Sequence, residues 1–290
     1  MPGHNRRRTV IVTGADSRIG RATAILLGER GHRVLACGVR KQPMTDLPRE
    51  TAPGGIIETH LSELKTKAEI RRAIKRAQEC FGTFDALVTS SSRGHFGSVE
   101  EIKESQTRSL FDQNFFDPMR IIQEVIPTLR AADSGTIVCI SSTAGRVALP
   151  MSGAYCATQH ALEGLCDTLR LELSIFGIDV VLIEPGFVRE SVAGRTAAEQ
   201  RSRRFKPPND DSPYYQLGQL LHGSIEELSK RAASPTDVAT LVQRALTARK
   251  PKPRYAISRS AAALLWAKKV LPDRFVDSRL AKAMGLKALE

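Results

Sequence analysis

The chain of 290 residues is 41% hydrophobic and 26% charged. This composition excludes a disordered or fibrous protein and allows a large core without disulfides or structural metals. Lys and Arg number 43 against 31 Asp and Glu, so the formal net charge is +12. The five cysteines are odd in number and form no Cys-x-x-Cys pair, which argues against a secreted disulfide scaffold and against a metal site.

The sequence offers no candidate for membrane insertion or export. No uncharged apolar run reaches the roughly 18 residues of a membrane span. A strand and a Gly-rich turn follow Arg6–Arg8 at once, so there is no place for the apolar segment and cleavage site of a signal peptide. The basic segments lack interleaved aromatic residues and any nucleic-acid motif. We expect a cytoplasmic protein with no transmembrane segment and no nucleic-acid partner.

Short β-branched runs alternate with segments of helical periodicity along the chain. In chain order we expect a strand at 10–12, a helix at 19–30, strands at 34–36 and 56–57, a basic helix at 63–81, a strand at 84–88, helices within 101–129, a strand at 136–140, a helix at 154–176, a strand at 180–183, a helix at 235–248, a strand at 255–257 and a helix at 260–270. Such alternation implies parallel strands joined by right-handed crossovers. The predicted fold is α/β, a Rossmann-type doubly wound parallel sheet with helices on both faces, in a single domain over 1–290.

Two segments depart from this alternation. Residues 187–213 are polar, basic and rich in proline, and a loop of that length inside a domain usually binds a ligand or covers a site. We therefore expect a lid or substrate loop over 187–232. Residues 259–290 form a C-terminal helical extension. Its apolar segment Leu264–Trp266 either docks on the core, caps a lipophilic cleft or lies on a membrane surface.

The first strand runs into a Gly-rich turn that opens a helix, Thr13-Gly14-Ala15-Asp16-Ser17-Arg18-Ile19-Gly20. Glycines let a backbone approach a pyrophosphate, and a helix N-terminus favours its negative charge. The turn therefore predicts a dinucleotide site. The candidate contacts in this segment are Gly14, Asp16, Ser17, Arg18, Ile19 and Gly20.

A second set of residues lies downstream, namely Asn114, Ser142, Tyr155, the position Gln159 four residues later, and Pro185-Gly186. In order and spacing, the two sets together resemble the short-chain dehydrogenase/reductase family of the classical type, over about residues 8–258. Tyr155 and Gln159 are one helical turn apart and share a face. The tail over 261–286, with Leu271-Pro272-Asp273-Arg274, is similar to the C-terminal extension of members that act on bulky lipophilic alcohols and ketones.

The resemblance implies a role for each matched position. Tyr155 would be the general acid/base, Ser142 would hydrogen-bond the substrate oxygen, and Asn114 would hold a proton-relay water in the middle of a helix. Gln159 would stand where the family holds the nicotinamide ribose. Further cofactor contacts would be His60 near the adenine, Ser90 after the fourth strand, and Pro185, Gly186 and Val188 near the nicotinamide.

Four positions depart from the family pattern. Arg18 replaces a turn glycine, Ser92 ends a Thr89–Ser92 segment where the family has Asn-Asn-Ala-Gly, Glu190 replaces a threonine, and Gln159 replaces the catalytic lysine. The lysine also lowers the tyrosine pKa, an effect of one to three pKa units or ~1.4–4 kcal/mol. Gln159 keeps hydrogen bonds but supplies no charge. His160 lies about 100° around the helix, so only Arg93 or Arg146 could restore the charge, from a loop.

The end of the second strand indicates the cofactor. An acidic residue there binds the ribose hydroxyls of NAD, whereas a basic one binds the extra phosphate of NADP. The segment Cys37-Gly38-Val39-Arg40-Lys41 has no acid and ends in two bases. Arg40 and Lys41 therefore favour NADP over NAD, although an ordinary solvated loop end would have the same composition.

Three functions remain open from the sequence. The first is an atypical NADPH-dependent carbonyl (keto) reductase for a bulky lipophilic small molecule. The second is a catalytically inactive paralogue that acts as a partner subunit or nucleotide-binding protein. The third is a non-redox enzyme that reuses Tyr155 and Ser142. We expect a homo-dimer or tetramer, because the helix at 154–176 carries more apolar surface than one sheet face needs.

Overall fold

Eight strands form one sheet in the computed structural model, which describes residues 7–51, 53–189, 208–230 and 232–286. The strands are β1 (Thr9–Val12), β2 (Arg33–Gly38), β3 (Glu50–Thr51), β4 (Gly55–Leu61), β5 (Ala86–Thr89), β6 (Gly135–Ile140), β7 (Ile178–Glu184) and β8 (Arg254–Ala256). All neighbouring strands pair in parallel except β3, which is antiparallel to β4. The helices are α1 (Arg18–Glu29), α2 (Lys41–Thr45), α3 (Lys67–Phe81), α4 (Glu104–Phe111), α5 (Asp117–Ala131), α6 (Gly153–Leu173), α8 (Tyr215–Lys230), α9 (Pro235–Thr247), α10 (Arg259–Val270) and α11 (Asp273–Ala283).

The strand order places a crevice in the middle of the sheet. The order is β3-β4-β2-β1-β5-β6-β7-β8, so the chain runs outward from β1 and then returns to place β5 against the other side of β1. This reversal is the topological switch point at which α/β sheets bind ligands, at the carboxyl ends of the strands. The predicted doubly wound parallel sheet is confirmed.

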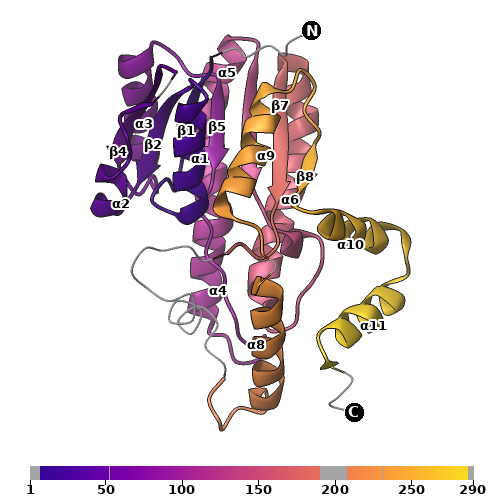
Figure 1. Ribbon diagram of the computed structural model, residues 1–290. Helices are drawn as coiled ribbons and strands as arrows, with labels where there is room; N and C mark the ends of the chain where they lie inside the picture. The colour runs from indigo at the N-terminus through magenta and orange to yellow at the C-terminus, as the bar shows by residue number, and fades with distance from the viewer. Residues whose placement is uncertain (1–6, 52, 190–207, 231, 287–290) are drawn as a thin grey trace.

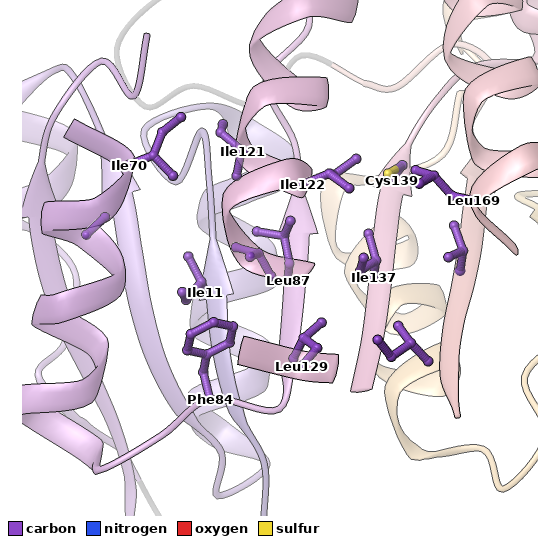
Figure 2. Close-up of a cluster of buried hydrophobic side chains, with 14 of the residues drawn as sticks. Ile11, Ile70, Phe84, Leu87, Ile121, Ile122, Leu129, Ile137, Cys139 and Leu169 are labelled. Carbon is purple, nitrogen blue, oxygen red and sulfur yellow. The ribbon is translucent and has the colours of Figure 1, made fainter. Parts of the chain in front are cut away.

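Alternate strand residues point to two separate cores, because successive side chains of a strand face opposite sides. Ile11 lies in one cluster with Ile70 of α3, Ile122 of α5 and Leu169 of α6 on one face (Figure 2). Val10 packs on the other face, in the cluster that includes side chains of α1 and α9. Figure 1 shows α1 and α9 side by side in front of the sheet. Helices therefore cover both faces, as the sequence predicts.

Several helix ends differ from the predicted ranges for local reasons. The helix expected at 63–81 begins at Lys67, because Leu64 has a φ of 54° and Thr66 caps the helix in a reciprocal box with Glu69. The helix expected at 154–176 ends at Leu173, and a 3₁₀ turn continues to Phe176.

Some elements were not predicted at all. They include α2 and the short strand β3. Helix α11 lies within the expected helical extension over 259–290, although no separate helix after 270 was predicted. The region expected to be a lid loop contains a 16-residue helix, α8, while 190–207 lie outside the described residues. No helix within the described ranges is both long enough and apolar enough to cross a bilayer.

An apolar cluster joins α8 and the C-terminal tail to two loops of the sheet. Phe96 of the loop after β5, Met151 before α6 and Leu221 of α8 are its buried members. Partly buried side chains pack against them, namely Tyr214, Leu217, Met284 and Leu286. The Ser224 hydroxyl donates a hydrogen bond to the Met284 carbonyl (3.3 Å). The end of the chain thus folds back onto α8 beside the loops that follow β5 and β6.

The close contact between the Gly-rich turn and α1 gives a test of the fold. A Cβ on Gly20 would lie 2.1 Å from the Gly14 carbonyl oxygen, whereas one on Gly164 of α6 would meet nothing within 4 Å. We expect Gly20→Ala to lower the free energy of unfolding by about 1–3 kcal/mol or more. Gly164→Ala should raise it by about 0.5–1 kcal/mol through helix propensity. Urea denaturation measures both, and equal effects would contradict the assigned contact.

Candidate active site

The turn after β1 is held tightly against the end of β5. Gly14 has a φ of 63°, and a Cβ there would lie 2.9 Å from the Ser90 carbonyl oxygen. Ser17 caps α1 by accepting a hydrogen bond from the Gly20 N–H (3.1 Å). Ile19, the second residue of α1, packs against the core below. The first N–H groups of α1 therefore face the crevice between β1 and β5, where anions are favoured.

Arg18 is the first residue of α1 and connects the two sides of this crevice. Its guanidinium donates a hydrogen bond to the Arg189 carbonyl (3.2 Å). Arg189 follows Pro185, Gly186 and Val188 in the segment after β7, and Val188 forms a β-bridge with Ala233. A cation thus lies between the Gly-rich turn and the segment after β7. Glu190, the next predicted departure, lies outside the described residues.

Arg40 at the end of β2 is bound to the same turn. Its backbone N–H and its Nε donate to the Asp16 carboxylate at 3.3 and 3.1 Å, and Nη2 donates to the Asp16 carbonyl. Gly38 permits this approach, because a Cβ there would lie 2.8 Å from Asp16 Oδ1. Lys41 begins α2 and is exposed. The two bases expected to select NADP therefore stand next to the Gly-rich turn, with Arg40 already oriented by Asp16.

His60 lies on β4, two strands away from β1, and Ser90 follows β5 on the other side of β1. His60 is half-buried in β4, opposite Cys37 of β2. Burial, with Arg76 and Arg72 of α3 adding to it, lowers the pKa of His60, which favours the neutral imidazole. Ser90 follows β5, and its buried hydroxyl makes no hydrogen bond within the described part of the chain.

Ser142 and Tyr155 approach the site from β6 and α6. Ser142 follows the end of β6, and its Oγ accepts a hydrogen bond from the Ala144 N–H (3.1 Å). The Thr143 N–H donates to the Pro185 carbonyl (3.0 Å), which fixes this turn to the end of β7. Tyr155 lies half-buried in the first turn of α6. Since Ser142 Oγ is an acceptor here, its own O–H can still donate to a substrate oxygen.

Asn114 lies inside a helical segment, as expected, and that segment is a π-helix (Asp112–Phe116) between α4 and α5. Its side chain is fully engaged with neighbouring elements. Oδ1 accepts from the Arg93 N–H (2.8 Å), and Nδ2 donates to the Arg93 carbonyl (2.9 Å) and to Thr158 Oγ1 (3.0 Å). Both amide hydrogens are therefore used, and Asn114 ties the loop after β5 to α6. Its role in holding a proton-relay water stays a prediction.

Gln159 is completely buried one turn after Tyr155. Its Nε2 donates to Thr158 Oγ1 at 3.4 Å, and its Oε1 has no hydrogen-bond partner among the described residues. Thr158 Oγ1 in turn donates to the Tyr155 carbonyl (2.7 Å). Sequence reasoning missed Thr158, although a hydroxyl in mid-helix three residues after Tyr155 is the signal that would have found it.

A network of ion pairs lies beside these residues, between α6, β7 and β8. The Arg254 guanidinium contacts Glu163 (3.0 Å), Glu184 (3.4 Å) and Asp167 (2.7 Å), and Arg146 contacts Glu184 (3.5 Å). Asp167 is a member of this network, although its local sequence is that of an ordinary solvated helix face. Its members are far apart in the sequence, so no local pattern announces them.

This network decides whether another cation replaces the missing lysine. Arg146 is paired with Glu184, so its charge is offset locally. Arg93 is exposed, and its backbone rather than its guanidinium meets Asn114. His160 is exposed, and its Nδ1 lies 2.9 Å from the Cys156 carbonyl. Within the described residues, the Gln159 side chain makes no hydrogen bond to Arg93, Arg146 or His160.

Two carboxyl groups of the network, those of Glu163 and Glu184, are harder to ionise than an exposed glutamate, whereas the pKa of Asp167 is lowered, with Arg254 and Arg170 favouring its charged form. Burial is the main cause that raises the pKa of Glu163, and burial followed by the Glu163 charge raises the pKa of Glu184. Neighbouring arginines act in the opposite direction without reversing either shift. Across the described part of the chain, no group of three or more His, Cys, Asp or Glu side chains could hold a metal ion.

The residues present fit a dinucleotide at this edge of the sheet. The Gly14 and Gly20 contacts leave no room for a Cβ, the α1 N-terminus and Arg18 supply positive charge, and Gln159 Oε1 is a buried acceptor with no partner in the described residues. A doubly wound sheet with these groups at its switch point is typical of nucleotide-dependent oxidoreductases.

Comparison with known proteins agrees with this geometry. The chain matches the short chain dehydrogenase family over residues 8–201, and it belongs to that family of oxidoreductases. A protein named NADPH-dependent 3-dehydrocapnine reductase, from Ornithobacterium rhinotracheale, is 28% identical over 93% of this chain and 95% of its own. A crystal structure of a short-chain dehydrogenase from Streptomyces avermitilis has a TM-score of 0.76 and 27% identity, with 99% and 98% of the two chains covered. A metagenomic short-chain oxidoreductase in complex with NADP has a TM-score of 0.65 and 25% identity, over 86% and 96%.

The raised pKa of Glu184 predicts a pH-dependent stability. The folded state binds protons more tightly than the unfolded state, so this contribution to stability is full below the ordinary glutamate pKa. It is lost as pH rises through the raised folded-state value. The stability of Glu184→Gln relative to the parent should therefore increase from pH 4.5 to pH 8. Urea denaturation across this range measures it, with Glu79→Gln on the exposed face of α3 as the control. A constant difference would contradict the burial argument.

Proposed function

We propose that this protein is an NADPH-dependent carbonyl reductase that acts on a bulky lipophilic small molecule. The observation that carries the proposal is the pairing of the retained Tyr155 and Ser142 with a neutral, buried Gln159. Reduction needs a neutral tyrosine as acid, whereas oxidation needs a tyrosinate as base. Without a cation beside Gln159, the neutral form of Tyr155, which can act as the acid, is favoured over the tyrosinate.

Each residue has a defined task in the proposed reaction. When bound, NADPH supplies the hydride. The Ser142 O–H donates a hydrogen bond to the carbonyl oxygen, and the Tyr155 O–H donates the proton to that oxygen as it becomes an alcohol. Gln159 Oε1 accepts from a ribose hydroxyl, which gives this buried acceptor a partner. Asn114 and Thr158 keep the loop after β5 and the start of α6 together.

The cofactor preference rests on Arg40 and Lys41. Both are exposed at the end of β2, and Arg40 is held beside the Gly-rich turn by Asp16. A basic pair here would contact the extra phosphate of NADP, and no acidic residue follows β2 to bind the ribose hydroxyls of NAD. The related reductase whose name states NADPH dependence supports the same choice.

The proposal of a lipophilic substrate is based on the apolar cluster of Phe96, Met151 and Leu221. It lies beside the loops that carry Ser90 and the start of α6, and the tail residues Met284 and Leu286 pack against it. An apolar cluster on these loops would suit a lipophilic molecule bound beside them, because ligand sites are lined mainly by apolar side chains.

We also propose a homo-oligomer and a cytoplasmic location. Leu171 and Ile175 at the end of α6 are 74% and 79% exposed, and large apolar side chains in such positions favour pairing with a second copy. All five cysteines are free, which supports a reducing compartment.

A second function, an inactive nucleotide-binding paralogue, is favoured by one contact. The Arg18 guanidinium reaches the Arg189 carbonyl and so occupies space where cofactor phosphates would lie. In this position the Arg18 guanidinium either binds a cofactor phosphate or blocks it, and measurements of NADPH affinity decide between these outcomes. A non-redox enzyme on the same scaffold remains the third alternative, and turnover without nicotinamide would support it.

Substitution of Arg18 tests the phosphate contact. If the guanidinium binds a phosphate, Arg18→Gly should weaken NADPH binding by about 1–3 kcal/mol, the loss of a charged hydrogen bond. Arg18→Lys should retain most of the affinity, because the charge remains. Titration followed by nicotinamide fluorescence measures all three proteins. Tighter binding by the glycine variant would show obstruction and support the inactive paralogue.

Substitution of Gln159 tests the direction of the reaction. Gln159→Lys should raise alcohol oxidation at pH 7 by roughly ten- to a thousandfold, matching one to three pKa units of tyrosine stabilisation. Gln159→Met, which is similar in length but uncharged, should give no such increase. In the parent protein, oxidation should rise steadily to about pH 10, the ordinary tyrosine pKa.

Tyr155→Phe should abolish both ketone reduction and alcohol oxidation. Reduction at the parent rate by Tyr155→Phe would show that the proton comes from another group.

A further inference from the structure

The C-terminal helices present an apolar face to solvent that no other element covers in the described structure. Trp266 and Val270 are one turn apart on α10 and are 66% and 51% exposed. Ala262, one turn earlier, is also exposed. Because residues at i, i+4 and i+8 share a helix face, these three side chains form one outward strip. Figure 1 shows α10 and α11 beyond the β8 edge of the sheet.

The strip continues onto α11. Leu271, in the link between the helices, is 36% exposed, and Phe275 in the first turn of α11 is 46% exposed. We call the side chains of Trp266, Val270, Leu271 and Phe275 the outer strip. Large apolar side chains gathered in this way mark an interaction surface rather than scattered surface residues.

The inner sides of the same helices are buried, so the outer strip has a fixed orientation. Leu265 of α10 and Val276 of α11 are 4% and 3% exposed. After α11, the Met284 carbonyl accepts a hydrogen bond from Ser224 of α8. Both helices are therefore anchored on one side and face solvent on the other.

Basic residues border the outer strip. Lys269 and Arg274 are exposed on either side of Leu271, and the Arg279 guanidinium lies over the Phe275 ring, 5.1 Å from its centroid. Lys268 is paired with Asp273 (2.5 Å). Trp, Phe and aliphatic side chains beside Lys and Arg are the composition of helices that lie in the surface of an anionic bilayer.

We propose that the outer strip docks on an anionic lipid surface. The basic border matches the negative potential of such a surface, and each nearby Lys or Arg contributes to attraction. A second copy of the chain fits less well. Pairing of two copies through this strip would remove the exposed Lys269 and Arg274 from water, and burying charges without partners is unfavourable. The docking does not depend on turnover and so stands apart from the proposed function.

The chain contains a single tryptophan, so its fluorescence reports on the outer strip alone. Adding phosphatidylglycerol vesicles should shift the Trp266 emission to the blue and increase its intensity, as the indole leaves water. Phosphatidylcholine vesicles should give a much weaker change. Absence of a shift with phosphatidylglycerol vesicles would overturn the proposal.

Matched variants separate this surface from the general basicity of the protein. Lys269→Gln should weaken binding to phosphatidylglycerol vesicles about fivefold, which corresponds to about 1 kcal/mol per basic residue. Lys75→Gln, the same change on the exposed face of α3, should leave binding unchanged. Val270→Gln should weaken binding without any change in charge. Equal effects of the two lysine variants would show a non-specific attraction and overturn the proposal.

Two controls cover the remaining outcomes. A blue shift that appears without vesicles as protein concentration rises, together with a larger mass by light scattering, would show that a second copy covers the strip. NADPH affinity should be the same in Lys269→Gln, Val270→Gln and the parent. Lost NADPH binding in these variants would indicate damage to the fold, in which case vesicle binding by Trp266→Phe, measured by sedimentation, tests the surface instead.

Discussion

Arg254 lies where three elements of the site meet, and the geometry of the site depends on its ion pairs. It is on the short edge strand β8, and it contacts Glu163 and Asp167 of α6 and Glu184 at the end of β7. The helix that carries Tyr155 and the strand that leads into Pro185-Gly186 are thereby held in one arrangement. Removing one partner of such a group leaves buried charge without compensation, which is far more costly than losing an exposed pair.

The same network explains why the loss of the lysine is not repaired nearby. Of the arginines near α6, Arg146 and Arg254 both pair with buried carboxylates, and Arg93 meets Asn114 through its backbone. These carboxylates already have raised pKa values because of burial. A guanidinium that turned toward Tyr155 would leave them without a partner. Arg146 and Arg254 therefore connect α6, β7 and β8 through their ion pairs.

Much of the fold and part of the site could be read from the sequence. Alternating apolar runs and helical periodicity predicted a doubly wound parallel sheet, because local patterns determine strands and helices, whereas the order of the strands came from the structure. The start of α3 was readable too, since Thr66 and Glu69 form a capping box, but the basic periodicity extended the prediction to residue 63. Helix α8 was missed because the prolines before it resembled a continuous loop. The contacts of Arg254 with Glu163 and of Arg18 with Arg189 span 91 and 171 residues, and only the folded chain brings them together.

The return of the C-terminal tail links parts of the molecule that are far apart in the sequence. Met284 and Leu286 pack against the cluster of Phe96, Met151 and Leu221, and the Met284 carbonyl accepts a hydrogen bond from Ser224 of α8. The loop after β5, the start of α6, helix α8 and the tail therefore share one small core. A substitution that loosens any one of these segments would expose apolar surface of the other three, so we expect them to unfold together rather than one by one.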